Sequence, residues 1–339
     1  MDSKTLNVVH FARRPAQDAF SMERVFHDVR SAMPEGLIIK QIRNARLSKG
    51  ILPRLLDALS ARNNASEINH VLGDVHYLTY FLPSQRTLLT VHDTGVFDRA
   101  RGWKRVIFWF FWFWLPTKRS ARLTTISEHT KQQLLSMVSY DPDRIHVIPN
   151  PIAPQFVAAP IRPREGTFRL LHIGTKANKN LERLIEAISG MDIELTVIGH
   201  MNSAQKDVIH KHKIQHRNLA NLSEDELSAE YERCEALAFV SLSEGFGLPI
   251  IEAQATGRPV LTSQLPPMDD VAGTGAIFVD PTNVAKIREA VSRLMRDGDL
   301  RESLIRRGQA NVRRFDPVVI AARYAELYRL IASEASTNI

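Results

Sequence analysis

Residues 244–252 read Glu-Gly-Phe-Gly-Leu-Pro-Ile-Ile-Glu, and they are the most informative part of the chain. Gly245 and Gly247 can adopt backbone angles closed to residues with a Cβ, so this turn can bring bare N–H groups up to an anion. Proline fits near a helix start, and the residues after Pro249 favour a helix, whose N-terminus attracts phosphate. The stretch therefore offers a phosphate-binding site between two carboxylates, Glu244 and Glu252. The plain alternative is a strand–turn–helix with surface glutamates.

The second half of the chain alternates short apolar runs with helical patterns. Runs 169–173, 194–198 and 236–240 read as strands that end just before Gly174, Gly199 or the 244–252 stretch. Between them, residues 180–189 place their apolar side chains on one helical face. This alternation predicts a parallel sheet with helices on both faces, which binds ligands beyond the carboxyl ends of its strands.

The first half alternates less clearly. Residues 21–32 predict a helix, residues 150–165 are rich in Pro and polar residues and indicate a linker, and residues 317–332 predict a final helix. The expected strands are Leu6–Phe11, Gly36–Ile42, Val75–Leu78, Leu88–His92, Leu123–Ser127 and Ile145–Ile148.

The ordered motifs resemble those of family 4 glycosyltransferases, which are recognised by a Glu-x7-Glu motif, here Glu244 and Glu252. The resemblance extends upstream to residues 172–175, Lys179-Asn180 and 221–223, and in the first half to 90–93, 126–128 and 148–150. It implies the GT-B fold, an α/β arrangement of two doubly wound Rossmann-like domains facing across a cleft. The expected domains are an acceptor-binding domain (1–155), a nucleotide-sugar donor-binding domain (156–315), and a last helix (316–339) that packs back on the first.

The resemblance also assigns roles on the donor side. Glu252 would bind the ribose hydroxyls and Glu244 would contact the transferred sugar. Lys179 follows a strand-to-loop turn and is the candidate phosphate cation, against the alternative of a solvated loop lysine. The remaining donor-binding candidates are Gly174 and Thr175 in the first loop and the backbone N–H groups of Phe246, Gly247 and Leu248.

The acceptor side is less clear from the sequence. His92 and Asp93 end an apolar strand, and the family carries His-Asp at the junction of donor sugar and acceptor; a packed His beside a capping Asp is the alternative. Many members have a Gly-Gly loop after the first strand, but this chain has Arg13 and Arg14 instead. Arg13, Arg14 and Asp93 are therefore weak acceptor-side candidates, and acceptor recognition cannot be copied from the family.

Composition narrows the class of protein. The chain has 339 residues, a net charge of +7 and one cysteine, Cys234, which fits a reducing compartment. We expect a cytoplasmic protein without a signal peptide, and no nucleic-acid binding, because the basic residues form no continuous face. The Asp-x-Asp triplets at 141–143 and 297–299 resemble a turn and a cap, so no metal or other cofactor is expected.

Residues 106–115 read Val-Ile-Phe-Trp-Phe-Phe-Trp-Phe-Trp-Leu, and all four tryptophans lie between Trp103 and Trp114. Ten apolar residues are too few to cross a bilayer, which needs roughly 20. Cations flank the run at Arg99, Arg101, Lys104, Arg105, Lys118 and Arg119. The segment Trp103–Leu115 is thus a candidate for contact with an anionic membrane surface, here the inner face of the cytoplasmic membrane. The alternatives are a buried helix and a subunit interface.

The resemblance implies a retaining, metal-independent glycosyltransferase that moves a sugar from a nucleotide-sugar donor to a glycan or lipid-linked acceptor. Bacterial cell-surface polysaccharide or glycolipid synthesis is the expected setting. The alternatives are a non-catalytic carbohydrate- or nucleotide-binding protein, and a sugar phosphorylase or epimerase of the same fold.

Overall fold

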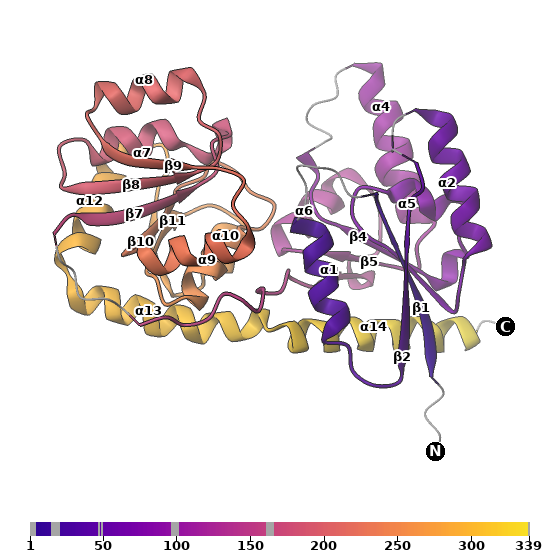
Figure 1. The fold of residues 1–339 in the computed structure, drawn as a ribbon. Helices are drawn as coiled ribbons and strands as arrows, with labels where there is room; N and C mark the ends of the chain where they lie inside the picture. Colours follow the sequence, from indigo (N-terminus) through magenta and orange to yellow (C-terminus); the bar gives the residue numbers. More distant parts are fainter. Residues whose placement is uncertain are drawn as a thin grey trace. The chain divides into compact units, whose positions relative to one another are not determined.

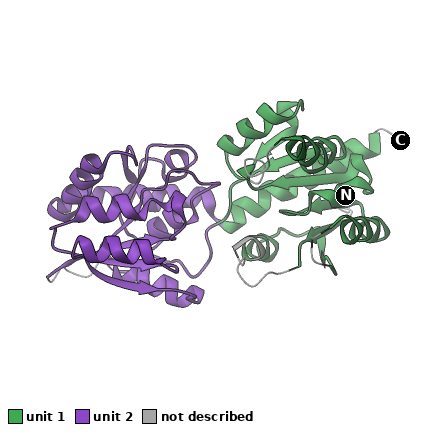
Figure 2. Cartoon of the chain, turned by 90° about the horizontal axis from the view of Figure 1, so that it is seen from above, with its two compact units in different colours: residues 1–151, 317–339 green, residues 152–316 purple. Residues whose placement is uncertain are grey.

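The computed structural model describes residues 5–14, 21–46, 48, 50–95, 102–160 and 166–337. The chain divides into two compact units (Figure 2), the first formed by Met1–Pro151 with Pro317–Ile339 and the second by Ile152–Asp316. The corresponding boundaries predicted from the sequence are 155/156 and 315/316. Arg99 and Arg101 lie outside the described residues.

Unit 1 is built on a six-stranded parallel sheet with the order β2-β1-β3-β4-β5-β6. The strands are β1 (Leu6–Ala12), β2 (Leu37–Arg43), β3 (Ile68–Val71), β4 (Thr87–Val91), β5 (Arg122–Thr125) and β6 (Ile145–Val147). The helices are α1 (Ser21–Ser31), α2 (Ile51–Asn63), α4 (Trp103–Trp109), α5 (Leu115–Lys118), α6 (Glu128–Met137) and α14 (Pro317–Thr337), with shorter turns η1 (His76–Tyr80), η2 (Ser84–Arg86), η3 (Phe110–Trp114) and η4 (Pro142–Arg144). Figure 1 shows them around the sheet.

Two apolar clusters cover the two faces of this sheet, because successive strand side chains point to opposite faces. Val8, Ile68 and Leu88 pack against α1 and α14. Val9, Val71 and Leu89 pack in the other cluster, with residues of α2, η1, η3 and α6. The final helix α14 therefore supplies one face of the unit 1 core.

One predicted strand is wrong. Residues Val75–Leu78 precede or form the 3-10 helix η1, and the strand that lies between β1 and β4 is β3, Ile68-Asn69-His70-Val71. The Asn and His side chains disguised this strand in the sequence. Both are fully buried and both form hydrogen bonds inside the unit, as buried polar groups must.

A buried polar network joins α14 to this sheet. The Tyr328 hydroxyl lies 2.8 Å from His10 Nε2 and 2.7 Å from His70 Nδ1, and His70 Nε2 lies 2.7 Å from Thr90 Oγ1. Burial, with a smaller contribution from the Arg30 charge, lowers the pKa of His10 to about 3. Burial also lowers the pKa of His70 well below its ordinary value, so both imidazoles of the network are neutral at neutral pH.

Unit 2 carries a second six-stranded parallel sheet, with the order β12-β11-β10-β7-β8-β9. Its strands are β7 (Phe168–Ile173), β8 (Ile193–Ile198), β9 (Gln215–Leu219), β10 (Ala236–Phe239), β11 (Val260–Ser263) and β12 (Ala276–Val279). The helices and turns are η5 (Ala177–Lys179), α7 (Leu181–Ile188), α8 (Ser203–Lys211), α9 (Glu224–Arg233), α10 (Leu248–Ala255), α11 (Met268–Ala272), α12 (Val284–Arg296), α13 (Gly298–Val312) and η6 (Arg313–Phe315).

The topology brings the predicted site residues of each unit to one edge of its sheet. In unit 2, Gly174 directly follows β7, Gly199 follows β8, and Glu244 lies in the loop after β10. In unit 1, Arg13 follows β1 and His92 follows β4. The carboxyl end of a parallel sheet is where ligands bind in such folds.

Candidate functional site

Lys179 and Glu244 form an ion pair in unit 2, although 65 positions separate them in the chain. Lys179 Nζ lies 2.6 Å from Glu244 Oε1 and 4.7 Å from the centre of the Phe239 ring. The two side chains are only 18% and 12% exposed, so water screens their attraction less than at an open surface. An ammonium has three N–H donors, and Glu244 orients the group while occupying one of them.

Gly174 makes room for the lysine side chain. Its φ is +97°, and a Cβ built there would lie 2.8 Å from Lys179 Cγ and 2.9 Å from Lys179 Cε. Only glycine adopts this backbone conformation without strain. Gly174, which the sequence predicts to be a donor-loop residue, leaves the space through which the Lys179 side chain reaches Glu244.

Asn178 and Asn180 fix the loop that carries Lys179, a role that is not predicted from the sequence. The Asn178 carbonyl accepts from the backbone N–H of Leu242 at 2.7 Å, and its side chain donates to the Ser243 carbonyl at 2.9 Å. Asn180 is buried at φ +61° and donates to the carbonyls of Val240 and Pro281. The loop after β7 is therefore tied to the loop after β10, which carries Glu244.

The turn before α10 places Gly247 in a left-handed backbone conformation. Gly247 is the N-cap residue at φ +108°, and a Cβ there would lie 3.1 Å from Ile250 Cδ1. The helix begins at Leu248 with Pro249 in its first turn. The first N–H groups of a helix lack partners within the helix, so the start of α10 can receive an anion beside the Lys179–Glu244 pair.

Glu252 lies on α10 with its side chain buried, at 4% exposure. Its Oε2 accepts a hydrogen bond from the Tyr231 hydroxyl at 2.8 Å. Glu252 is thus a held carboxylate and not the exposed helix glutamate of the plain alternative. Sequence reasoning missed Tyr231, because nothing in the spacing of a residue on α9 signals contact with α10.

Thr175 is held from two sides. Its hydroxyl donates to the His200 carbonyl at 2.8 Å, and its own carbonyl accepts from Gln205 Nε2 at 2.8 Å. Gly199, at φ +127°, permits this approach, since a Cβ there would lie 3.2 Å from Thr175 Cγ2. Thr175 therefore shapes the loop after β7 through contacts with the loop after β8.

The acceptor-side candidates all lie in unit 1. His92 is buried, and its ring lies edge-on to Phe26 at 5.8 Å. Asp93 Oδ1 accepts from the Gly95 N–H at 3.0 Å, Arg13 pairs with Asp74 at 3.4 Å, and Arg14 is exposed. Arg13, His92 and Asp93 share the carboxyl edge of the unit 1 sheet, whereas the donor-side candidates belong to unit 2.

The described part of the chain holds no group of three His, Cys, Asp or Glu side chains that could bind a metal ion. Both Asp-x-Asp triplets have structural uses. Asp141 Oδ1 accepts from the Asp143 N–H at 3.0 Å at the start of η4, and Asp297 Oδ1 accepts from the Leu300 N–H at 2.8 Å as the N-cap of α13.

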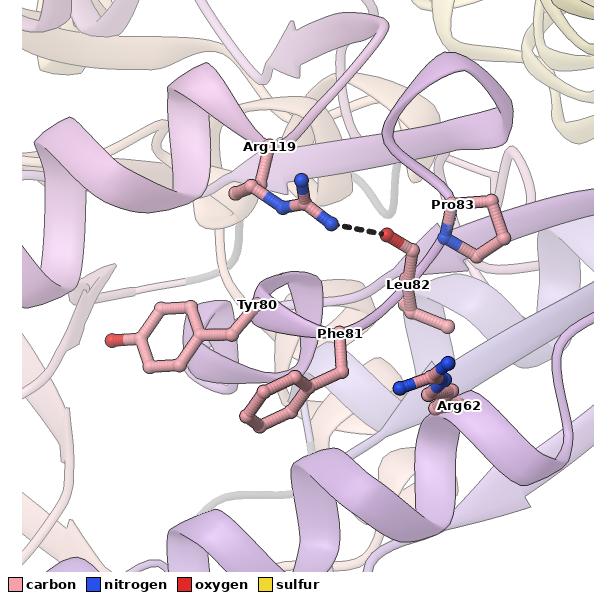
Figure 3. A pocket seen from close by; sticks show the side chains of 6 residues that line it. All are labelled: Arg62, Tyr80, Phe81, Leu82, Pro83 and Arg119. Atoms are coloured by element: carbon pink, nitrogen blue, oxygen red, sulfur yellow. Dashed lines mark hydrogen bonds between the residues drawn. The ribbon is translucent and has the colours of Figure 1, made fainter.

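A hollow of about 480 Å³ lies in unit 1 away from these candidates (Figure 3). Its lining includes the guanidinium groups of Arg62 and Arg119, and Arg119 Nη2 donates to the Leu82 carbonyl at 3.1 Å. None of the predicted site residues lines it.

Comparison with known families assigns both halves of the chain. Residues 10–156 match the model for Glycosyltransferase Family 4, and residues 159–311 match that for Glycosyl transferases group 1. The chain belongs to the family 4 glycosyltransferases. Its strand order and the solved structures it resembles place it in the GT-B fold.

Relatives agree with this assignment. The chain is 26% identical to the O-antigen chain mannosyltransferase RfbU of Salmonella typhimurium over 60% of this chain and 62% of that protein. It is 23% identical to the O-antigen chain mannosyltransferase B of Escherichia coli over 76% of this chain and 74% of that protein. Among solved structures, a glycosyltransferase from Rickettsia africae superposes with a TM-score of 0.76 at 16% identity, covering 96% of this chain and 98% of that one. Anabaena HepE in complex with UDP and glucose gives 0.75 at 13%, over 95% and 99%.

Proposed function

We propose that this glycosyltransferase moves a sugar from a nucleotide-sugar donor to a glycan or lipid-linked acceptor, with retention of the anomeric configuration and without a metal ion. The observation that carries the proposal is the Lys179–Glu244 pair beside the start of α10. It combines a positioned cation, a helix N-terminus and a carboxylate, which are the groups that a sugar diphosphate requires.

The chemistry follows from the charges that develop during transfer. Breaking the bond between sugar and phosphate leaves negative charge on the departing phosphate. Lys179 and the N–H groups of Gly247 and Leu248 would stabilise that charge, since donors already in place act without reorganisation. Glu244 would hold the lysine and contact the sugar, and Glu252, positioned by Tyr231, would bind the ribose hydroxyls.

His92 is proposed to act on the acceptor side. It follows β4 at the carboxyl edge of unit 1, where an imidazole can accept or donate a hydrogen bond to the acceptor or the sugar. Retention and independence from metal rest on the family's Glu-x7-Glu motif and on the presence of a lysine in the role of phosphate cation.

The relatives narrow the setting. Two are named as mannosyltransferases of O-antigen chains. We extend this to a hexosyl donor, with a mannosyl nucleotide the first to test, and to cell-surface polysaccharide or glycolipid synthesis at the cytoplasmic face of the membrane. The described residues contain no helix long and apolar enough to cross a bilayer.

A thermal-shift screen of UDP-, GDP- and ADP-sugars tests the proposal, because a ligand that binds only the folded protein raises its stability. One donor class should raise the melting temperature of the wild type, and Lys179→Ala should abolish most of the shift. Lys176→Ala is the matched control, since Lys176 lies in the same loop but is exposed. Transfer by the selected donor should persist in EDTA, and NMR of the product should show a retained anomeric configuration. A chain that responds to no nucleotide sugar, or equally in both lysine variants, contradicts the proposed donor site.

A further inference from the structure

The helix α4 and the turn η3 that continues it turn an apolar stripe to solvent. Trp103 is 70% exposed, Val106 63% and Ile107 48%, and Phe110 and Phe111 continue the stripe. These positions recur at helical spacing and so share one face. The other face is buried: Trp112 and Phe113 lie in the unit 1 core, and Trp109 Nε1 donates to the Met137 carbonyl at 2.7 Å. The aromatic run thus has a core side and a solvent side.

The helix α2, which was not predicted from the sequence, carries a second stripe of exposed apolar side chains. Ile51 is 86% exposed and Leu52 65%, and the stripe continues through Leu55, Leu56 and Leu59. Its inner face packs into the core through Ala58 and Ala61. Five exposed aliphatic side chains on one face of a 13-residue helix need a partner, because contiguous apolar patches of this kind mark interaction surfaces.

The two stripes belong to neighbouring segments. The Arg54 guanidinium of α2 lies 5.2 Å from the centre of the Trp112 ring in η3. At their carboxyl-terminal ends, Arg62 of α2 and Arg119 after α5 line the same hollow (Figure 3). Figure 1 shows α2 and α4 next to each other on unit 1.

Charge decides which partner fits this surface. The chain has no Asp or Glu between residues 99 and 127, and the only acidic residue of α2 is Asp57. Asp57 is buried and paired with Arg46 at 3.0 Å. The exposed charges of the α4–α5 segment are Lys104 and Arg105 in the first turn of α4, and Lys118 beyond the end of the stripe. An apolar stripe accompanied by cations complements an anionic lipid surface, where apolar side chains enter the acyl boundary and cations meet phosphate.

We infer that α2 and the segment Trp103–Phe111 form one docking surface for a bilayer that contains anionic phospholipid. The two helices lie in the interface and do not span it. A hollow of about 460 Å³ beside α4, with Arg105, Trp109 and Ser136 in its lining, offers room for a lipid headgroup. Each helix returns from the carboxyl end of a parallel strand, so its first turn lies toward the sheet edge that holds His92. Docking here would bring a lipid-linked acceptor to that edge, a consequence that rests on the proposed function, whereas docking itself does not.

Vesicle co-sedimentation of the full chain tests the surface directly. We expect wild-type protein to sediment with vesicles of phosphatidylglycerol and phosphatidylethanolamine and to stay in solution with phosphatidylcholine vesicles. Leu52→Ser/Leu55→Ser on α2 and Val106→Ser/Ile107→Ser on α4 should each weaken sedimentation by about tenfold or more, since each removes two inserted side chains. Lys104→Glu/Arg105→Glu should weaken it by about tenfold as well and remove its salt dependence.

The matched control is Val318→Ser/Val319→Ser. These valines are 64% and 45% exposed on α14, which covers the opposite face of the sheet. This variant should sediment like the wild type. All variants should keep their circular dichroism and the thermal shift with the donor, and Lys179→Ala should keep vesicle binding, so a failure of docking and a failure of the donor site are distinguishable.

Four results overturn the inference. If the wild-type protein does not sediment with anionic vesicles, a lipid partner is excluded. If it sediments equally with phosphatidylcholine vesicles and anionic vesicles, charge has no role in docking. An α2 variant that sediments like the wild type removes α2 from the surface. A dimer in sedimentation velocity that the α2 or α4 variants dissociate, without vesicle binding by any form, assigns the surface to a second copy of the chain.

Discussion

The substitution Gly174→Ala tests whether donor binding depends on the space that Gly174 leaves for the Lys179 side chain. The new Cβ would lie 2.8 Å from Lys179 Cγ, whereas carbon atoms in ordinary contact are roughly 3.5–4.0 Å apart. The lysine chain therefore has to move by about 1 Å. Its Nζ is 2.6 Å from Glu244 Oε1, so a shift of that size breaks or bends the pair that aims the ammonium. The substitution also places a non-glycine residue at φ +97°, which costs about 1–3 kcal/mol of folding free energy.

Gly190→Ala separates these two effects. Gly190 has φ +73° in the same unit, but a Cβ there meets no atom within 4 Å. Both variants should lose a similar amount of stability, measured by urea unfolding. Only Gly174→Ala should lose affinity for the nucleoside diphosphate of the donor. The loss should be about 1.5–3 kcal/mol, the worth of a hydrogen bond to a charged group, or roughly 10- to 150-fold in Kd.

Titration calorimetry with the nucleoside and with its diphosphate gives the decisive comparison. We expect Gly174→Ala to bind the nucleoside like the wild type and the diphosphate weakly. Equal diphosphate affinity in Gly174→Ala, Gly190→Ala and the wild type would refute the argument, because the lysine would then reach the phosphate by a path that Gly174 does not control.

Three further outcomes are expected. Glu252→Ala should weaken nucleotide binding by about 1–3 kcal/mol through the lost ribose contact; unchanged nucleoside affinity in calorimetry would remove Glu252 from that role. His92→Ala should lower the transfer rate strongly and leave nucleotide affinity near normal, and a full transfer rate would reduce His92 to a packed residue. Burial lowers the folded-state pKa values of His10 and His70 below the unfolded value of about 6.5. Their contribution to stability is therefore present above that pH and is lost as the pH falls, for His10 toward its folded-state pKa of about 3. Protonation linked to His10 alone should lower the free energy of unfolding of unit 1 by about 2 kcal/mol between pH 7 and pH 5. Urea unfolding followed by tryptophan fluorescence measures this change, since all four tryptophans lie in unit 1. A urea midpoint at pH 5 that is no lower than at pH 7 contradicts the prediction.

How far the sequence predicts the structure depends on what each residue packs against. The alternation of strands and helices and the ordered motifs predicted most strands of both sheets, because period and turn chemistry are local. The strand Ile68–Val71 was missed because the polar partners of Asn69 and His70 come from distant segments, as with Tyr328. The α2 stripe was missed for a related reason: periodicity shows that Ile51 and Leu52 share a face, but only the packing of Ala58 and Ala61 shows that this face points outward. The pairing of Glu252 with Tyr231 likewise appears only when α9 packs beside α10.

The sequence predicts a donor site in more detail than an acceptor site, for a physical reason. A sugar diphosphate makes a similar demand on every enzyme that uses it, and the proposed donor site in unit 2 would meet that demand largely with backbone geometry: few residues can replace the left-handed Gly174, Asn180 and Gly247. Acceptors differ from one enzyme to the next, so loops can carry their recognition in residues without a shared pattern. In this chain the loop after β1 already commits Arg13 to Asp74 and leaves Arg14 exposed. Of the two candidate cations, Arg14 is therefore the one exposed to solvent, while Arg13 is engaged with Asp74.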